Sequence, residues 1–418
     1  MKLNVLRNII LGISILVITF GIGYRVGQKS TSVSSSLSAV EIVGQTKGKN
    51  PTVDFSLFWD VWDRVGKYYI DKEKIDPQKM VYGAISGMVS SLGDPYTVFL
   101  PPTQNKEAKD DLGGKFEGIG AQLGVKEKKI VVIAPLKGTP AETAGIKSGD
   151  WIVKVDGKET LNWTVFEAVS KIRGPKGSSV ELTIVHKDAS SSSDIKVTRD
   201  TINVASVEWE LKNLSCSSEN NCKKVVYLKL SRFGDQTSEE WNKGISEILQ
   251  ALPGTASQTN DEIKGLVFDL RNNPGGYLAG SVFIASEFLK DGIVVKQESI
   301  RSGNQQYSVD RKGRLTSIPM VVLINKGTAS AGEIVAGSLQ ERARAKLFGE
   351  TTFGKGSVQE AQELEGGAGI HITTAKWLLP SGKWINGTGI EPDIAVTNDE
   401  SKPEEDTQLL KALEYLIK

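Results

Sequence analysis

Two short apolar runs constrain the fold of this 418-residue chain more than any other feature of its sequence. They are Gly265–Leu270 (GLVFDL) and Met320–Ile324 (MVVLI), and each has the length and composition of a buried β-strand. Helical patterns occupy Glu239–Leu252 and Gly280–Leu289, on either side of the first run, and a further helix is expected from about Ala331. This alternation of strands and helices predicts an α/β core.

A different pattern, of short strands and glycine turns, fills the region from Lys115 to His186. Its first glycine turn can present backbone N–H groups to a carboxylate, and the strand that follows offers an edge to an added peptide strand. The predicted peptide-binding residues are Gly118, Ile119, Gly120 and Ala121. A short helix at Pro140–Asp150 and a strand with a hairpin turn at Ile152–Gly157 complete the pattern. The combination resembles a PDZ domain, which implies a protein or peptide with an exposed C-terminus as the partner.

Amphipathic helices are predicted near both ends of the chain. From Asp54 onward, apolar and aromatic residues recur at helical spacing, and a second helix is expected from Pro77 to about Leu92. The final segment, Glu404–Lys418, has the pattern of one more amphipathic helix. The aromatic face of the first helix favours a place in the core or in a subunit interface. The N-terminal and C-terminal helices are therefore candidate surfaces for a homodimer.

The N-terminus has the composition of a membrane anchor. Ile9–Tyr24 is uncharged and mostly apolar, with basic residues on both sides. Its length is at the short end of the ~17–25 residues that span a bilayer. A cleaved signal peptide is the alternative, but the nearest small-x-small site, at Ser36–Ser38, lies well downstream. We therefore expect an uncleaved signal anchor followed by a Ser- and Gly-rich tether.

Two cysteines suggest the compartment in which the protein folds. Cys216 and Cys222 lie in a polar stretch (NLSCSSENNCKK) that is expected to be a loop before the strand Val225–Leu230. Five residues separate them, which suits a disulfide that staples a hairpin loop. A disulfide implies an oxidising compartment, so the body of the protein would lie outside the cytoplasm. Two free, exposed thiols are the alternative.

Charge and histidine content argue against several classes of function. The net charge is +1, from 51 basic and 50 acidic residues, and no basic stretch is interleaved with aromatic residues, so a nucleic-acid partner is not expected. The cysteines lack CxxC-type metal spacing, and neither a metal nor a cofactor is expected. The only histidines are His186 and His371, and neither lies in a segment suited to catalysis. A Ser-His-Asp enzyme is therefore improbable.

Ser330 is the strongest candidate for a nucleophile. The buried run Met320–Ile324 leads to it through GTASAGEIVAG, so the serine stands where a helix begins. The first N–H groups of such a helix could stabilise the oxyanion of an acyl transfer. A plain helix N-cap is the alternative role of the serine. A base is also required, and Lys355, between two glycines in FGKGSVQ, could serve if burial lowers its pKa. An ordinary surface lysine is the alternative there.

Three separated motifs turn these candidates into a firm prediction. GTASAGEI, TTFGKGSVQ and DLRNNPGG together resemble the carboxyl-terminal processing peptidases, or tail-specific proteases, of the S41 serine peptidase family. Ser330 precedes Lys355 by 25 residues and Gln359 by 29, as in the Ser-Lys-Gln arrangement of that family. The resemblance also includes GDPYTVFL at Gly93–Leu100 and GTGIEPDI at Gly387–Ile394.

The resemblance implies a role for each matching residue. Ser330 would be the acylated nucleophile, Lys355 the general base and then acid, and Gln359 the residue that orients the lysine. The oxyanion hole would use the backbone N–H of Ala331 together with that of Gly275 or Gly276, a choice that the sequence leaves open. Arg173, in the PDZ-like region, matches a position where similar proteases couple ligand binding to the active site, although a solvated arginine is the alternative.

The expected fold is multidomain α+β, with an α/β protease core of the crotonase or ClpP type, an inserted PDZ domain and an N-terminal helical segment. The expected function is that of a membrane-anchored, extracytoplasmic serine endopeptidase that recognises C-terminal tails. An inactive PDZ scaffold and a crotonase-type enzyme acting on coenzyme A thioesters are the alternatives. The predicted divisions are 1–27 (signal anchor), 28–52 (linker), 53–102 (N-terminal helical domain), 103–190 (PDZ domain), 191–400 (protease core) and 401–418 (C-terminal helix).

Overall fold

The computed structural model describes residues 54–136, 138–163, 165–186, 189, 191–218, 221–252, 262–398 and 405–417. The predicted anchor and linker, residues 1–27 and 28–52, lie outside these ranges. Among the residues that the structure does describe, no helix is both long enough and apolar enough to cross a membrane. The described residues fall into two compact units, with the division between Ala84 and Ile85.

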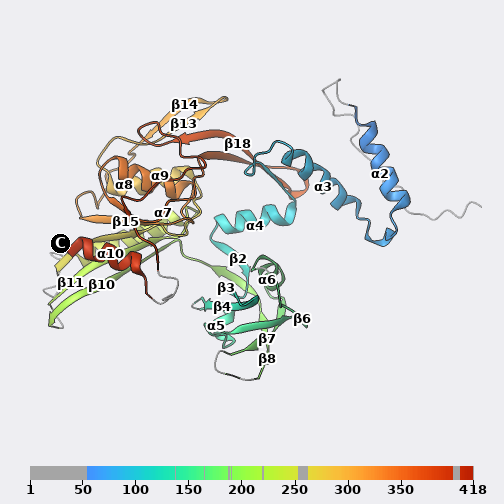
Figure 1. The fold of residues 1–418 in the computed structure, drawn as a ribbon, viewed down its shortest axis with the longest axis horizontal. Helices are drawn as coiled ribbons and strands as arrows, with labels where there is room; N and C mark the ends of the chain where they lie inside the picture. Colours follow the sequence, from blue (N-terminus) through green and yellow to red (C-terminus); the bar gives the residue numbers. More distant parts are fainter. Residues whose placement is uncertain are drawn as a thin grey trace, which may run out of the picture. The chain divides into compact units, whose positions relative to one another are not determined.

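The described part of the first unit is helical. Helix α2 (Ser56–Tyr68) is followed by a 3-10 turn at Lys72–Lys74 and by α3 (Pro77–Ser90), which runs past the boundary of the unit (Figure 1). The two helices predicted near the N-terminus are confirmed. The rings of Phe58, Trp59 and Trp62 contact one another along α2, with centroids 4.9 to 6.3 Å apart.

The PDZ-like region is built on an antiparallel sheet in the order β3-β4-β5-β7-β8, with β6 paired to β5. Its strands are β3 (Ala121–Lys126), β4 (Lys129–Pro135), β5 (Trp151–Val155), β6 (Lys158–Glu159), β7 (Ser179–Val185) and β8 (Ser193–Thr198). Helices α5 (Pro140–Thr143) and α6 (Val165–Ile172) accompany it, and α6 packs against β3 and β5. Ile130, Ile152 and Leu182 are fully buried between them.

The PDZ-like sheet is connected to the rest of the second unit through two further strands and a helix. Strand β2 (Lys115–Gly118) enters the region, and β9 (Asp200–Asn203) leaves it and pairs antiparallel with β2. Helix α4 (Pro102–Leu112) precedes β2. The entry and exit of the chain therefore lie side by side, as an inserted domain requires.

The protease-like core contains a second sheet, in the order β10-β11-β12-β15-β16-β19. All neighbours from β11 to β19 are parallel, and only β10 and β11 form an antiparallel hairpin. The strands are β10 (Val207–Ser218), β11 (Asn221–Leu230), β12 (Glu262–Asp269), β15 (Met320–Ile324), β16 (Lys346–Gly349) and β19 (Ile394–Ala395). Parallel strands with intervening helices confirm the predicted α/β core.

Helices α7 (Thr237–Ala251), α8 (Leu278–Phe288) and α9 (Ala331–Glu341) belong to this core. Trp241 of α7, Phe268 of β12 and Phe288 of α8 are fully buried, and their ring centroids lie 5.2 to 5.8 Å apart. The C-terminal helix α10 (Thr407–Ile417) packs against β12, β15 and β16 (Figure 1). The predicted C-terminal helix is confirmed, and it is part of the core.

A third sheet carries much of the active-site region. It has the order β1-β18-β13-β14, with β17 also paired to β18. The strands are β1 (Val98–Leu100), β13 (Ile293–Ser299), β14 (Gly303–Ser308), β17 (Ser357–Glu363) and β18 (Gly369–Leu378). Because Val98 pairs with His371 of β18, the segment before β1 is brought to the sheet in which Gln359 lies on β17, a strand that begins two residues after Lys355.

The polar stretch around the two cysteines differs from its prediction as a loop. Strands β10 and β11 extend through it, and the backbones of Cys216 and Cys222 are paired directly across the hairpin. Backbone pairing of the two long strands thus overrides the polar, turn-like composition. The side chains of both cysteines lie outside the described residues, so the disulfide stays a prediction.

Candidate active site

Ser330 stands at the junction that the sequence predicted. Strand β15 ends at Ile324, and Ser330 is the N-cap of α9 with φ 51° and ψ −117°, a region that non-glycine residues rarely adopt. The loop before it is fixed by hydrogen bonds, from Thr328 Oγ1 to the Leu270 carbonyl at 2.8 Å and from the Ala329 N–H to the Asn273 carbonyl at 2.8 Å. The unusual backbone of Ser330 is therefore held in place by the neighbouring β12 loop.

Glu333, one turn into α9, connects the serine to the lysine segment. Its carboxylate is fully buried and accepts hydrogen bonds from the backbone N–H of Ser330 at 2.8 Å and of Lys355 at 2.9 Å. It also accepts from the Gly354 N–H at 2.7 Å and the Thr352 hydroxyl at 2.6 Å. The four donors come from two separate segments, which local sequence could not reveal.

Lys355 lies in a partly buried environment. Burial lowers the pKa of its amine below the ordinary value. The negative charges of Asp94 and Glu333 raise this pKa, but burial outweighs them. The amine nitrogen lies 4.9 Å from the centroid of the Tyr96 ring. Within the described residues it donates no hydrogen bond to a side chain. A lysine with a lowered pKa is the species that a Ser-Lys mechanism requires.

Gln359 is near the lysine in sequence but bonded elsewhere in the structure. Its amide nitrogen donates to the hydroxyls of Ser357, at 2.9 Å, and Thr373, at 3.1 Å. An irregularity in the pairing of β17 with β18 falls between Val358 and Gln359 and so shifts the register at this residue. Among the described residues, no hydrogen bond joins Gln359 to Lys355.

The two candidate oxyanion glycines differ in their surroundings. Gly275 is buried, and its N–H is already donated to Asn273 Oδ1 at 2.8 Å. A Cβ on Gly275 would lie 2.7 Å from Ser330 Cβ and 2.9 Å from the Ala331 nitrogen, so this backbone abuts the serine turn. Gly276 is exposed and forms a parallel bridge with Phe233. Within the described chain, neither the Gly276 N–H nor the Ala331 N–H donates a hydrogen bond.

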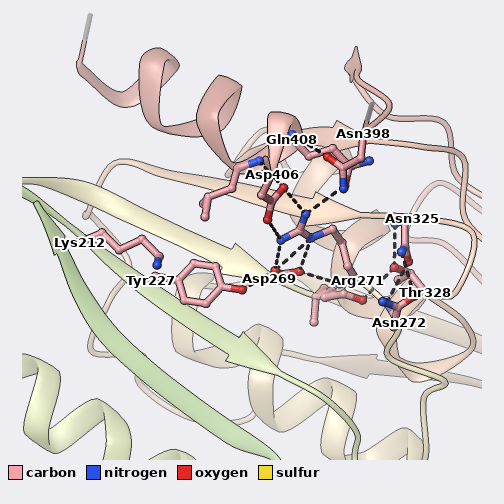
Figure 2. Close-up of polar contacts among 12 residues, drawn as sticks. Lys212, Tyr227, Asp269, Arg271, Asn272, Asn325, Thr328, Asn398, Asp406 and Gln408 are labelled. Atoms are coloured by element: carbon pink, nitrogen blue, oxygen red, sulfur yellow. Dashed lines mark hydrogen bonds and ion pairs between the residues drawn. The ribbon is translucent and has the colours of Figure 1, made fainter. Parts of the chain in front are cut away.

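A charged cluster anchors the loop that carries these glycines (Figure 2). Arg271 forms bidentate ion pairs with Asp269, at the end of β12, and with Asp406, just before α10. The Tyr227 hydroxyl donates to Asp269 at 2.6 Å, and Arg271 also donates to Gln408 at 3.1 Å. The cluster ties α10 to the start of the DLRNNPGG loop. Only the glycines of this motif were predicted to have a role, and Arg271 was not.

A second tie joins that loop to the serine loop. The Asn325 side chain accepts from the Asn272 N–H at 2.9 Å and donates to Asn272 Oδ1 at 2.9 Å (Figure 2). The same Asn325 oxygen accepts from the Gly327 N–H at 3.0 Å. Two loops that follow neighbouring parallel strands are thereby locked to each other, as expected where active sites form at the carboxyl ends of such strands.

The predicted peptide-binding residues run from Gly118, the last residue of β2, to Ala121, the first residue of β3. The Gly120 carbonyl accepts from the Leu136 N–H at 2.8 Å, and Gly120 has φ 78° with no room for a Cβ beside Thr139. The Ile119 side chain is buried in the core of the PDZ-like region. Strand β3, which follows the turn, is the edge strand of its sheet. This edge is available to an added strand.

Arg173 follows α6 and lies between the PDZ-like region and α4. Its guanidinium lies 4.6 Å from the centroid of the Phe116 ring and 3.5 Å from the Asp111 carboxylate. Phe116 belongs to β2, and Asp111 is near the end of α4. The residue is therefore placed against both the entry strand and the preceding helix rather than in open solvent.

A pocket of about 500 Å³ opens beside Gly354. One wall is the turn Gly93–Tyr96 and the other is formed by Phe353, Gly354, Asn386 and Gly387. The wall around Gly354 continues into the serine turn because both bind the Glu333 carboxylate. Gly93–Leu100 is part of the family resemblance, but no site residue was predicted there.

Comparison with known proteins matches this geometry to one family. Residues 224–396 match Peptidase family S41, residues 107–185 match the PDZ domain and residues 16–103 match the activating protease CtpB N-terminal domain. The chain is 36% identical over 353 residues to carboxy-terminal processing protease CtpA of Bacillus subtilis (strain 168), over 84% of this chain and 71% of the relative. The chain belongs to peptidase family S41.

Other S41 peptidases extend the match. Carboxy-terminal processing protease CtpB of Bacillus subtilis (strain 168) is 37% identical over 324 residues, which are 78% of this chain and 64% of the relative. The solved structure of the photosystem II D1 C-terminal processing protease is similar, with a TM-score of 0.51 and 28% identity, over 85% of this chain and 96% of that one. The predicted family, fold class and serine peptidase activity are confirmed, and the crotonase-type alternative is not supported.

Proposed function

We propose that this S41 peptidase cleaves peptide bonds by Ser-Lys catalysis, with Ser330 as nucleophile and neutral Lys355 as general base. The observation that carries the proposal is the Glu333 carboxylate, which binds the backbone N–H of both residues. Ser330 Oγ attacks the scissile carbonyl as its proton passes to the Lys355 amine. The ammonium then protonates the leaving amine, and an acyl-enzyme remains. Water, activated by Lys355 in turn, releases the acid and restores the serine.

The oxyanion of the tetrahedral intermediate is assigned to the N–H groups of Ala331 and Gly276. The Ala331 N–H lies at the start of α9, where the helix dipole favours negative charge. Gly276 is preferred to Gly275 because the Gly275 N–H is donated to Asn273 Oδ1. The bridge to Phe233 uses the Gly275 carbonyl and the Tyr277 N–H, so it leaves the Gly276 N–H available.

Gln359 is assigned the orientation of Lys355. The Ser357 and Thr373 hydroxyls hold its amide nitrogen, and the amide oxygen accepts no hydrogen bond among the described residues. That oxygen could receive an N–H of the Lys355 amine and aim its lone pair at Ser330.

Substrate recognition is assigned to the PDZ-like region. The turn at residues 118–121 would bind the terminal carboxylate, and the tail would add to the edge of β3. Arg173 would transmit this binding, since it contacts both β2 and α4. The protein would act outside the cytoplasm, held at the membrane by an anchor at residues 1–27. In that oxidising compartment Cys216 and Cys222 would form a disulfide. The N-terminal and C-terminal helices would provide the surfaces of a homodimer.

The mechanism is tested with the full chain in detergent and an unfolded protein substrate. Ser330→Ala and Lys355→Ala should each reduce kcat by at least about a thousandfold, since neither nucleophile nor base can be replaced by water alone. Lys326→Ala, which removes an exposed lysine from the loop before Ser330, is the matched control and should retain activity. Cleavage by both Ser330→Ala and Lys355→Ala at the wild-type rate would exclude the mechanism, and a wild-type chain that binds tails without cleaving them would favour the inactive scaffold.

A further inference from the structure

The turn before β1 brings two side chains to the Lys355 amine from a segment outside the serine, lysine and oxyanion loops. Strand β1 pairs with β18, with Val98 opposite His371, and so places Asp94 and Tyr96 beside the lysine. The Lys355 nitrogen lies 4.9 Å from the centroid of the Tyr96 ring, within the range of a cation–π contact.

Asp94 makes the turn rigid. Its carboxylate accepts from the Thr97 hydroxyl at 2.6 Å and from the Tyr96 N–H at 3.0 Å. Burial would raise the pKa of the Asp94 carboxyl, but hydrogen bonds, including one from the Thr373 hydroxyl, outweigh burial and lower it, so Asp94 is charged at neutral pH. A fixed negative charge therefore faces the lysine.

The turn is also tied to the strand that holds Gln359. The Thr373 N–H donates to the Thr97 hydroxyl at 3.0 Å, and the Thr373 hydroxyl accepts from the Gln359 amide at 3.1 Å. The Tyr96 ring, the Asp94 carboxylate and the Gln359 amide thus belong to one hydrogen-bonded assembly around Lys355.

We propose that Asp94 and Tyr96 are positioning residues that hold the protonated Lys355 side chain against the Tyr96 ring and so determine the pH at which the amine becomes available to Ser330. The proposal rests on the proposed role of Lys355 as general base. A ring face attracts an ammonium ion but not a neutral amine, so loss of the proton removes the attraction to Tyr96. The unprotonated lysine, the form that acts as base, is then the form that can leave the ring.

Other charged or titratable groups face the amine from the remaining elements. Glu333 of α9 also favours the ammonium, although its carboxylate oxygens are engaged by four donors. His371 of β18 is half-buried, and its pKa is lowered first by burial and then by the positive charge of Lys355. Neither group can be altered without disturbing the core or β18, whereas Asp94 and Tyr96 can be changed at the turn.

The test follows the titration of Lys355 directly. The full chain with Ser330→Ala is labelled with carbon-13 at the lysine ε position, and the Lys355 resonance is assigned by its loss in Lys355→Arg. Asp94→Asn and Tyr96→Leu should each move the titration midpoint to lower pH, by roughly half a unit to one unit, because each removes an interaction that favours the ammonium. Tyr96→Phe retains the ring and should leave the midpoint in place. Asp310→Asn, an exposed carboxylate after β14, is the control for charge alone.

The same variants with Ser330 restored should show the acid limb of the kcat/KM profile shifted by the same amount. A merely structural defect would lower the plateau without moving the limb. Unchanged midpoints in both Asp94→Asn and Tyr96→Leu would overturn the proposal, and Tyr96→Leu alone decides it if Asp94→Asn fails to fold. If the titration midpoints shift but the wild-type chain cleaves no substrate, the positioning role of Asp94 and Tyr96 is supported and the proposed proteolytic mechanism is rejected.

Discussion

At the scale of single residues, Glu333 contributes most to the geometry of the site. Four donors from the serine turn and the lysine segment converge on one fully buried carboxylate. Glu333→Gln keeps the shape but turns one acceptor oxygen into an NH₂ group that faces donors. We expect the free energy of unfolding to fall by about 3 kcal/mol and kcat to fall at least about a hundredfold. Denaturant unfolding and hydrolysis of an unfolded substrate measure the two effects.

Glu341→Gln is the matched control for this substitution. Glu341 ends the same helix and accepts two hydrogen bonds from Ser381, but it is exposed. Glu341→Gln should lower the free energy of unfolding by about 1 kcal/mol or less and leave kcat unaltered. Equal effects of the two substitutions would show that Glu333 only stabilises α9.

Residue-level prediction succeeded where the chemistry is local. The turn at Ser330 follows from a buried strand that ends in small residues before a helix, and the structure places the serine at the N-cap of α9. Three of the four donors to Glu333, and the Thr373 hydroxyl that bonds Asp94, could not be foreseen because they lie far along the chain from the carboxylates that they contact. Spacing identified Gln359, but its hydrogen bonds depend on a register irregularity between β17 and β18 that no local pattern reveals.

At the scale of elements, the cluster around Arg271 links the C-terminal helix to the oxyanion loop (Figure 2). Arg271 is mostly buried between Asp269 and Asp406, and removal of one partner leaves an incompletely compensated charge. We expect Asp406→Asn to reduce the free energy of unfolding by about 2 kcal/mol and to lower kcat about tenfold with little change in KM. Steady-state kinetics and thermal unfolding test this.

Lys411→Gln, on the exposed face of α10, is the control and should change neither quantity. A fall in stability without any fall in kcat would show that α10 stabilises the sheet but does not position the loop. The sequence predicted α10 and the strand before Arg271 as separate elements. Their connection could not be predicted, because it depends on how α10 packs across β12, β15 and β16.

Elements with a clear apolar period were predicted closely, whereas the hairpin β10–β11 was predicted with too long a loop. Its polar, asparagine-rich tip has the composition of a loop, yet the strands pair through Cys216 and Cys222. Cross-strand pairing is a long-range effect, and strand propensity is correspondingly dependent on context. The strands of the PDZ-like region, in contrast, follow from glycine turns at short intervals.

At the scale of the whole second unit, Arg173 lies on a continuous path from the PDZ-like region to the protease-like core. It pairs with Asp111 of α4, and the Asp111 carbonyl accepts from Arg232 at 3.0 Å. The Leu112 carbonyl, at the end of α4, accepts from the Asp235 N–H at 3.1 Å. A ligand that moves α6 would therefore act through Arg173 on a helix that is bonded to the segment before α7.

This path predicts that Arg173→Ala uncouples tail binding from cleavage. A substrate with a C-terminal tail should lose severalfold in kcat/KM, while a short peptide that cannot reach the PDZ-like region should be cleaved as before, since Arg173 touches no catalytic group. Binding of the tail itself, measured by fluorescence anisotropy, should change little. Lys171→Ala, two residues earlier and in the last turn of α6, is the control with the same charge change. If Arg173→Ala reduces cleavage of both substrates equally, Arg173 supports the fold and transmits nothing. If it abolishes tail binding, the residue belongs to the binding groove instead.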